Sequence, residues 1–100
     1  MIRGSEFDIA ELSLSSYLMA VDRKQPLEAI PVFLHRRFRH GFIFINANAG
    51  IKEPKDLIGK RIGVKTFQAT AILWLRGMLE HEYGVPHRDV TWIAELDEDV

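Results

Sequence analysis

The pattern of apolar and polar positions along the chain predicts several short strands. Residues 7–12 (FDIAEL) alternate in part, and residues 29–34 (AIPVFL) have strand character, with Pro31 favouring an edge position. Residues 41–46 (GFIFIN) form the most strand-like run. Because their apolar positions are continuous, we expect both faces of that strand to be covered. Two further strands are predicted at residues 61–64 (RIGV) and 90–93 (VTWI).

Helical periodicity appears between these runs. Residues 14–21 (LSSYLMAV) predict a helix that begins after serine and carries its two leucines and its valine on one side. Residues 68–83 have the best helical pattern in the chain, and residues 53–59 (EPKDLIG) predict a single helical turn with proline at its first position. Because strands alternate with helices, the sequence predicts an α/β fold with a largely parallel sheet.

Composition narrows the class of protein without naming a function. A chain of 100 residues is about the size of one small domain, and 47% hydrophobic with 27% charged residues is ordinary for a globular protein. The net charge of −1 gives nucleic-acid binding little support. No apolar run approaches the roughly 20 residues of a membrane-spanning helix. The absence of cysteine excludes disulfides and thiolate metal sites.

The segment SLSS (13–16) places three serines at the start of the first predicted helix. A helix start leaves backbone N–H groups unpaired and carries partial positive charge, so serine caps it readily. At the carboxyl end of a strand the same arrangement can bind an anion, because hydroxyl and N–H groups converge on one point. Capping is the simpler explanation, but three serines exceed what a cap requires, and both interpretations stay open.

The tract HRRFRH (35–40) holds three arginines and two histidines. Such a run is usually a solvated basic loop. Guanidinium groups nevertheless bind carboxylates in bidentate fashion, and histidine transfers protons near neutral pH. Alternate side chains of an extended segment share a face, which divides the tract into two sets. These sets are Arg37 and Arg39 on one face, and Arg36, Phe38 and His40 on the other.

The segment KTFQAT (65–70) lies at the turn from a predicted strand into the long helix. Gln68 and Thr70 stand at this turn, where capping is again the simpler explanation. Later in the chain, His81 and His87 have no liganding companions at regular spacing. We therefore expect no metal site and no other cofactor.

The motifs in this order resemble one known family. DLIGKRIGV, then a small turn and a long helix ending in YGV, is similar to the entry into the second lobe of type II periplasmic-binding-protein folds. It follows FDIAELSLSSYL and IPVFLHRRFRH and continues as TFQATAILWLRGMLEHEYGV. Together these segments closely resemble the 4,5-dihydroxyphthalate decarboxylase family over nearly all 100 residues.

The resemblance implies an α/β, two-lobed fold of the type II periplasmic-binding-protein kind, with mostly parallel sheets and only part of each lobe present. Residues 1–45 would be part of the first lobe with a crossing strand, and residues 46–100 would be the start of the second lobe. The SLSS turn would then face the turn before the long helix across an inter-lobe cleft. The implied substrate-binding residues at these turns are Ser13, Ser15, Ser16, Gln68 and Thr70.

The activity implied by the resemblance is loss of CO₂ from a dihydroxylated aromatic acid, such as 4,5-dihydroxyphthalate, to give 3,4-dihydroxybenzoate. Anchoring of its carboxylates would fall to the serine turn and to arginines of the basic tract. Those arginines are Arg36, Arg37 and Arg39. A proton must also reach the ring carbon that loses CO₂. His40 is the first candidate for that role, with Glu11 and His35 behind it.

A binding protein is the competing interpretation, because the same two-lobed fold captures small organic anions for uptake transporters without chemistry. The enzyme would be cytoplasmic and the binding protein periplasmic. In either case the expected partner is a small aromatic carboxylate or a similar anion, with no nucleic acid and no membrane. A third interpretation is a structural fragment that keeps the local elements of the fold and has no activity by itself. Its uncovered apolar surface would then favour association, for example into a homo-oligomer, or poor solubility.

Overall fold

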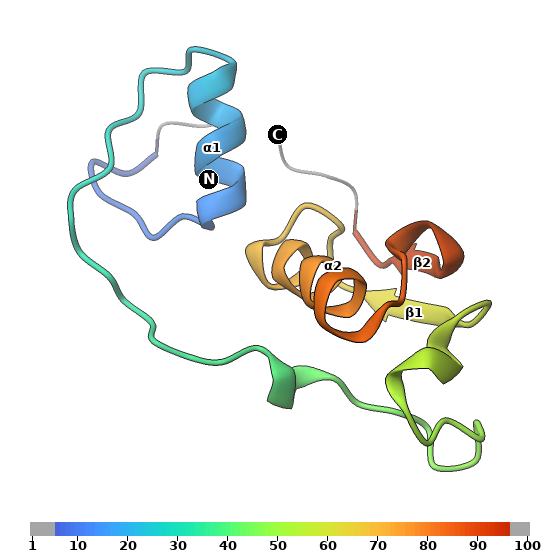
Figure 1. Ribbon diagram of the computed structural model, residues 1–100. Coiled ribbons are helices and arrows are strands. Elements are labelled where there is room, and N and C mark those ends of the chain that lie inside the picture. Colours follow the sequence, from blue (N-terminus) through green and yellow to red (C-terminus); the bar gives the residue numbers. More distant parts are fainter. Residues whose placement is uncertain (1–5, 97–100) are drawn as a thin grey trace.

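The computed structural model describes residues 6–96 and shows a β–α–β unit at the end of a long, largely irregular segment (Figure 1). Strands β1 (Arg61–Val64) and β2 (Thr91–Ala94) pair in parallel, with Arg61 opposite Thr91 and Val64 opposite Ala94. The chain passes between the two strands through helix α2 (Thr70–Tyr83), and helix α1 (Leu14–Asp22) comes before both. Short 3₁₀ turns lie at His40–Phe42, Pro54–Leu57 and His87–Asp89.

The hydrophobic core lies between α2, the 3₁₀ turn before β1 and the segment that leads from α2 into β2. Leu75 and Leu79, one turn apart on α2, are both buried, which confirms the predicted apolar side of this helix. The residues of this core are Leu57, Leu75, Leu79, Val85 and Val90, with Ile51, Ile62, Met78 and Trp92 packed against it. All of them fall within residues 51–96, so this region holds the core.

Local sequence signals end α2 and form the turn before β1. Gly84 adopts the left-handed conformation at φ 66°, where glycine meets no Cβ penalty, and the Val85 N–H then donates to the Leu79 carbonyl at 2.8 Å. The 3₁₀ turn begins at Pro54 and carries a capping box between Glu53 and Asp56. Both the predicted helix and the predicted single turn are confirmed.

Three of the five predicted strands are wrong. Residues 7–12 and 29–34 have no regular structure, and residues 41–46 combine the end of a 3₁₀ turn with an extended, exposed segment. Phe44, expected to be covered on both faces, is 88% exposed. A strand requires a hydrogen-bonded neighbour, and within residues 6–96 the only strand pair is β1 with β2. These three runs have strand-like sequences, but no other segment of residues 6–96 pairs with them.

Helix α1 forms as predicted but turns the unexpected side toward the rest of the molecule. Its apolar side, Leu14, Leu18 and Val21, is about half exposed, whereas Ser15 and Ser16 are buried. The buried side lies against the start of α2 (Figure 1). Polar contacts, described below, hold the helix in this orientation.

The observed fold supports a small α/β class with parallel strands. The radius of gyration is 15.9 Å, larger than the roughly 13 Å expected of a compact domain of this length. After α1 the chain runs in a wide arc apart from the β–α–β unit before it returns to it, which extends the molecule (Figure 1). Within the described residues, no helix has both the length and the apolarity that crossing a membrane demands. The division at residues 45 and 46 into two lobes stays a prediction.

Candidate functional site

The starts of the two α-helices meet and cap each other. The Thr70 N–H, at the start of α2, donates to Ser13 Oγ at 3.2 Å, and the Ser15 N–H of α1 donates to Thr70 Oγ1 at 3.0 Å. The two hydroxyl oxygens, Ser13 Oγ and Thr70 Oγ1, lie 2.6 Å apart. Neither helix has a side-chain cap from its own capping residue. The simpler sequence interpretation, in which Ser13 caps its own helix, is therefore wrong, because its hydroxyl caps the other helix instead.

Further polar groups extend this contact into a hydroxyl cluster, which we define as Ser13, Ser15, Ser16, Gln68 and Thr70. Ser15 Oγ donates to the Gln68 carbonyl and lies 3.2 Å from both Ser13 Oγ and Thr70 Oγ1. The Gln68 side-chain amide donates to Ser16 Oγ at 3.5 Å. The structure therefore brings together all five residues that the two turns contributed to the predicted binding site.

The electrostatics of the hydroxyl cluster favour an anion. Each helix N-terminus carries partial positive charge, and here two such ends converge. Neither helix has an acidic residue in its first turn. The nearest acidic residue in sequence, Glu11, has its carboxylate against His35, with 3.5 Å between Glu11 Oε1 and His35 Nε2. Neutral hydroxyl and N–H groups at a positive position are well suited to hydrogen-bond a carboxylate.

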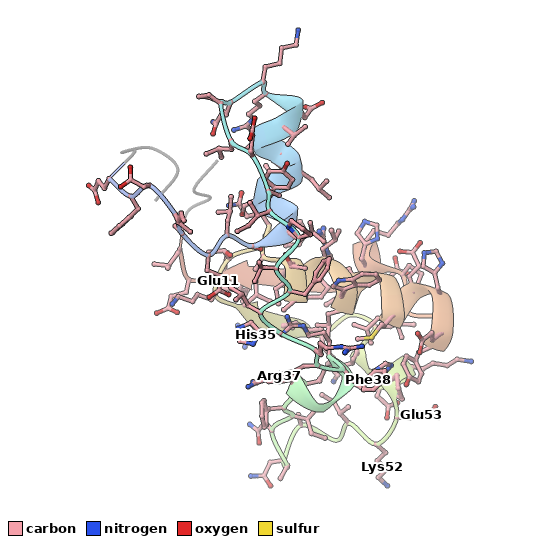
Figure 2. All side chains as sticks on the ribbon, turned by 90° about the vertical axis from the view of Figure 1, so that its left-hand side faces the viewer. Glu11, His35, Arg37, Phe38, Lys52 and Glu53 are labelled. Atoms are coloured by element: carbon pink, nitrogen blue, oxygen red, sulfur yellow. The ribbon has the colours of Figure 1, made fainter. Side chains whose placement is uncertain are left out.

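Glu11 and His35 face each other below the start of α1 (Figure 2). His35 Nε2 lies 3.5 Å from Glu11 Oε1, and the two side chains are 55% and 62% exposed, respectively. Sequence reasoning named both residues as proton-transfer candidates but did not predict that they pair. Two irregular segments carry them, so no helical or strand spacing could have indicated the contact.

The predicted arginines do not converge on the hydroxyl cluster. Arg36 and Arg37 are exposed, and the Arg39 guanidinium lies 5.8 Å from the centre of the Phe42 ring in a cation–π contact. Within residues 6–96, no ion pair or hydrogen bond joins these arginines to the cluster. Their role in holding a carboxylate stays a prediction.

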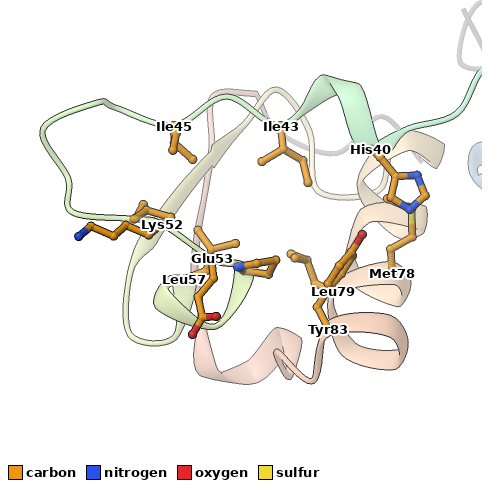
Figure 3. Close-up of a pocket in the computed structure, with 11 residues that line it drawn as sticks. His40, Ile43, Ile45, Lys52, Glu53, Leu57, Met78, Leu79 and Tyr83 are labelled. Atoms are coloured by element: carbon orange, nitrogen blue, oxygen red, sulfur yellow. The ribbon is translucent and has the colours of Figure 1, made fainter.

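His40 lies beside a different feature, a hollow of about 270 Å³ next to the second half of α2 (Figure 3). Apolar side chains form most of its wall, including Ile43, Met78 and Tyr83. His40 Nε2 lies 3.3 Å from Glu82 Oε2. Glu82 is in the last turn of α2, and a rise of about 1.5 Å per residue puts it about 18 Å from Thr70. His40 therefore lies far from the hydroxyl cluster.

Another set of contacts was not predicted. His87 Nδ1 lies 2.7 Å from Glu80 Oε2, and this hydrogen bond holds the pKa of Glu80 below its ordinary value of 4.5. Arg76 stacks on Phe67, with 3.9 Å between its guanidinium carbon and the ring centre. The turn after Gly84 folds His87 back onto α2, and the contact between His87 and Glu80 depends on that turn.

Metal ligation finds no support in these contacts. Among residues 6–96, no three His, Cys, Asp or Glu side chains gather closely enough to hold an ion. The chemistry available at the hydroxyl cluster is hydrogen bonding to an anion, and the chemistry available at Glu11 and His35 is proton exchange.

Comparison with known proteins identifies the class to which these features belong. The model of the NMT1/THI5 like family matches residues 2–97, so the chain belongs to this family, whose fold is of the periplasmic-binding-protein kind. Within it, the chain is similar to two curated proteins, both called 4,5-dihydroxyphthalate decarboxylase. One, from Comamonas testosteroni, is 47% identical over 97% of the chain, and one from Pseudomonas putida is 47% identical over 91%. The resemblance found in the sequence motifs is thereby confirmed.

The matches cover only part of each relative. The chain spans 30% of the Comamonas protein and 36% of the Pseudomonas protein, which is about a third of their length. The activity of the whole relative therefore does not pass to this chain by similarity alone.

Proposed function

We propose that this chain forms part of a decarboxylase that removes CO₂ from a dihydroxylated aromatic acid of the phthalate type. The observation that carries the proposal is the 47% identity to 4,5-dihydroxyphthalate decarboxylases over 97% and 91% of the chain. On this proposal the substrate resembles 4,5-dihydroxyphthalate and the product resembles 3,4-dihydroxybenzoate.

The hydroxyl cluster supports an anchoring role in this reaction. A phthalate-type substrate has one carboxylate that leaves and one that stays, and the retained group needs donors to hold it in place. Ser15 and Thr70 supply hydroxyl and N–H donors at the point where two helix N-termini converge. We assign the retained carboxylate to this cluster, where it would replace the hydrogen bonds that the two helix starts now make with each other.

The departing carboxylate has the opposite requirement. Strong binding of this group in the ground state would oppose catalysis, because only interactions that strengthen in the transition state accelerate the reaction. It should therefore lie outside the cluster, over a less polar part of the site. A ring hydroxyl para to the departing group makes the ring carbon basic enough to accept a proton.

The proposal includes the two-lobed arrangement of the family. Residues 1–45 would belong to the first lobe and residues 46–100 to the second, with α1 and α2 approaching a ligand from the two sides of the inter-lobe cleft. What supports this arrangement is that the two helix starts, from distant parts of the chain, already face each other through the hydroxyl cluster.

The test is to follow CO₂ release from dihydroxyphthalate isomers and to identify the aromatic product. The sample is the longest natural chain that contains these 100 residues, with the 100-residue chain alone as a second sample. Phthalate, which lacks the ring hydroxyls, serves as the binding control. Release of CO₂ from the 4,5-isomer supports the proposal. Binding of both acids without turnover would replace it with the solute-binding interpretation, and neither binding nor turnover would reject both.

The cluster variant Ser15→Ala tests the anchoring role. We expect KM to rise roughly tenfold, equivalent to about 1.4 kcal/mol of lost binding, with a smaller change in kcat. Thr66→Ala, which lies before α2 and outside the cluster, is the matched control. An unchanged KM in Ser15→Ala would remove the cluster from the substrate site.

A further inference from the structure

We propose that His35 and Glu11 form the proton-transfer pair of the reaction, with His35 as the acid and Glu11 as the residue that positions it. This inference rests on the proposed function and adds the source of the proton. Of the proton-transfer candidates named from the sequence, these two residues contact each other, whereas His40 does not take part in that contact.

The positions of the histidines decide between the candidates. The chain has four histidines, all within the described residues. His40 pairs with Glu82 and His87 pairs with Glu80, and both glutamates lie in the second half of α2, as does His81. With a rise of about 1.5 Å per residue, Glu80 is about 15 Å from the start of that helix. These three histidines therefore lie toward the end of α2 that is remote from the hydroxyl cluster.

His35 is different because its partner lies next to the cluster. Glu11 is separated from Ser13 by one residue, and consecutive Cα atoms are about 3.8 Å apart, so the two Cα atoms lie within about 8 Å. The contact of 3.5 Å between His35 Nε2 and Glu11 Oε1 then places the imidazole against a residue that is close in the chain to the cluster. The two carboxylates of a phthalate are on adjacent ring carbons, so the proposal requires the imidazole to reach a carbon next to the one whose carboxylate is held at the cluster.

Exposure and orientation suit this role. Both side chains are more than half exposed, so a ligand can reach them, and an exposed pair of this kind adds little to folding stability. Because Nε2 faces the Glu11 carboxylate, Nδ1 is the ring nitrogen left to meet a substrate. The carboxylate fixes the orientation of the imidazole, as an acidic partner does for a catalytic histidine.

The step balances with these two groups and the substrate alone. The Nδ1–H of the imidazolium gives its proton to the ring carbon that bears the departing carboxylate, and a π electron pair of the ring forms the new C–H bond. The C–C bond to the carboxylate then breaks, CO₂ leaves, and the electron pair of that bond restores the aromatic ring. Neutral His35 regains its proton from solvent, so the sum is loss of one CO₂ from the ring carboxylate and gain of one H⁺ from solvent.

The experiment compares His35→Asn, His35→Ala and Glu11→Gln in the longest natural chain, with His81→Ala as the matched control on an exposed histidine. We expect kcat to fall roughly 10²–10⁴-fold in both His35 variants and about tenfold in Glu11→Gln, with KM nearly unchanged. Added imidazole should restore part of the activity of His35→Ala. A histidine with only a structural role would not be replaced in this way.

Each outcome decides a separate point. If wild type and His81→Ala release CO₂ and His35→Asn does so at the same rate, the pair is rejected while the proposed function stands. Loss of kcat in His40→Ala alone would transfer the role to His40. If wild type turns over none of the isomers, the proposed function fails, and phthalate is then titrated while the ring signals of His35 are followed by NMR. A shift at His35 and none at His81 keeps the pair as a ligand-facing group, and no shift at His35 rejects it.

Discussion

Residues 51–96 and residues 6–50 have similar sequence signals and different structures. In residues 51–96 the two predicted strands pair directly with each other, and α2 connects them. Together they cover a core in which Leu79 is 2% exposed. In residues 6–50 equally apolar strand-like runs stay unpaired, and Phe33 is 86% exposed. The difference shows that a β pattern becomes a strand only when a neighbouring strand completes its hydrogen bonds, whereas a helix completes its own. Helix α1 therefore forms in the same region in which three predicted strands do not.

The two regions are joined at the hydroxyl cluster. Ser13 and Ser15 come from residues 6–50, and Gln68 and Thr70 come from residues 51–96. Helix α1 would otherwise bury little, because its apolar side is about half exposed. The contact between the helix starts thus accounts for the orientation of α1.

The largest expected effect is on the stability of the core in residues 51–96. Leu79→Ala removes a side chain that is nearly fully buried, and we expect the free energy of unfolding to fall by about 2–5 kcal/mol. Phe33→Ala, in the other region, removes a larger side chain that contacts mostly solvent, so its effect should stay within about 0.5 kcal/mol. Urea unfolding followed by far-UV circular dichroism measures both values.

Equal losses in Leu79→Ala and Phe33→Ala would break the comparison between the regions, because Phe33 would then be buried in solution. Self-association is the first explanation to test in that case, by repeating the measurement over a range of protein concentrations.

A smaller effect is expected where the two regions meet. Ser13→Ala and Thr70→Ala each remove one of the two hydroxyls that cap the opposite helix, and each should cost about 1 kcal/mol of unfolding free energy. Because the hydroxyls act on each other, the double variant should cost less than the sum, by roughly 0.5–1 kcal/mol. A double-mutant cycle by urea unfolding measures this coupling.

Additive losses in that cycle would mean that the two helix starts do not contact each other in solution. Residues 6–50 would then be held to residues 51–96 by the chain connection alone, and the regions would unfold independently.

The smallest expected effect concerns pH and lies within residues 51–96. The pKa of Glu80 is lowered, chiefly by the hydrogen bond from the His87 side chain and then by the His87 N–H. A lowered pKa means that the folded state favours the carboxylate, so this stabilisation is present above pH 4.5 and is lost as pH falls through the lowered pKa. Wild type should therefore exceed Glu80→Gln in melting temperature near pH 6, and the difference should shrink toward pH 3.

Thermal unfolding at both pH values provides that measurement. Glu95→Gln, which removes an exposed carboxylate just after β2, is the control for the general effect of charge. A difference between wild type and Glu80→Gln that stays constant from pH 6 to pH 3 would contradict the proposed linkage to Glu80.

Sequence reasoning predicted the residues of the hydroxyl cluster more completely than it predicted the contact between Glu11 and His35. The cluster could be predicted because helix starts have characteristic residues. SLSS and FQAT both lie at the starts of helices that the structure confirms. The pairing of Glu11 with His35 could not be predicted, because neither residue lies on a helix or strand with a regular period. A charged tract such as HRRFRH likewise shows that basic residues are present, but it does not show which of their side chains points toward a binding site.

By itself, the sequence determined the elements whose hydrogen bonds and caps are local. These are the turn at Pro54, the helix that ends at Gly84, and the β–α–β order that makes parallel pairing possible. Only the tertiary structure decided which apolar runs became strands, which side of α1 was buried, and which hydroxyl caps which helix. The physical reason is the same in each case, because strand pairing, burial and cross-capping join groups distant in the chain and depend on a partner that local sequence does not specify.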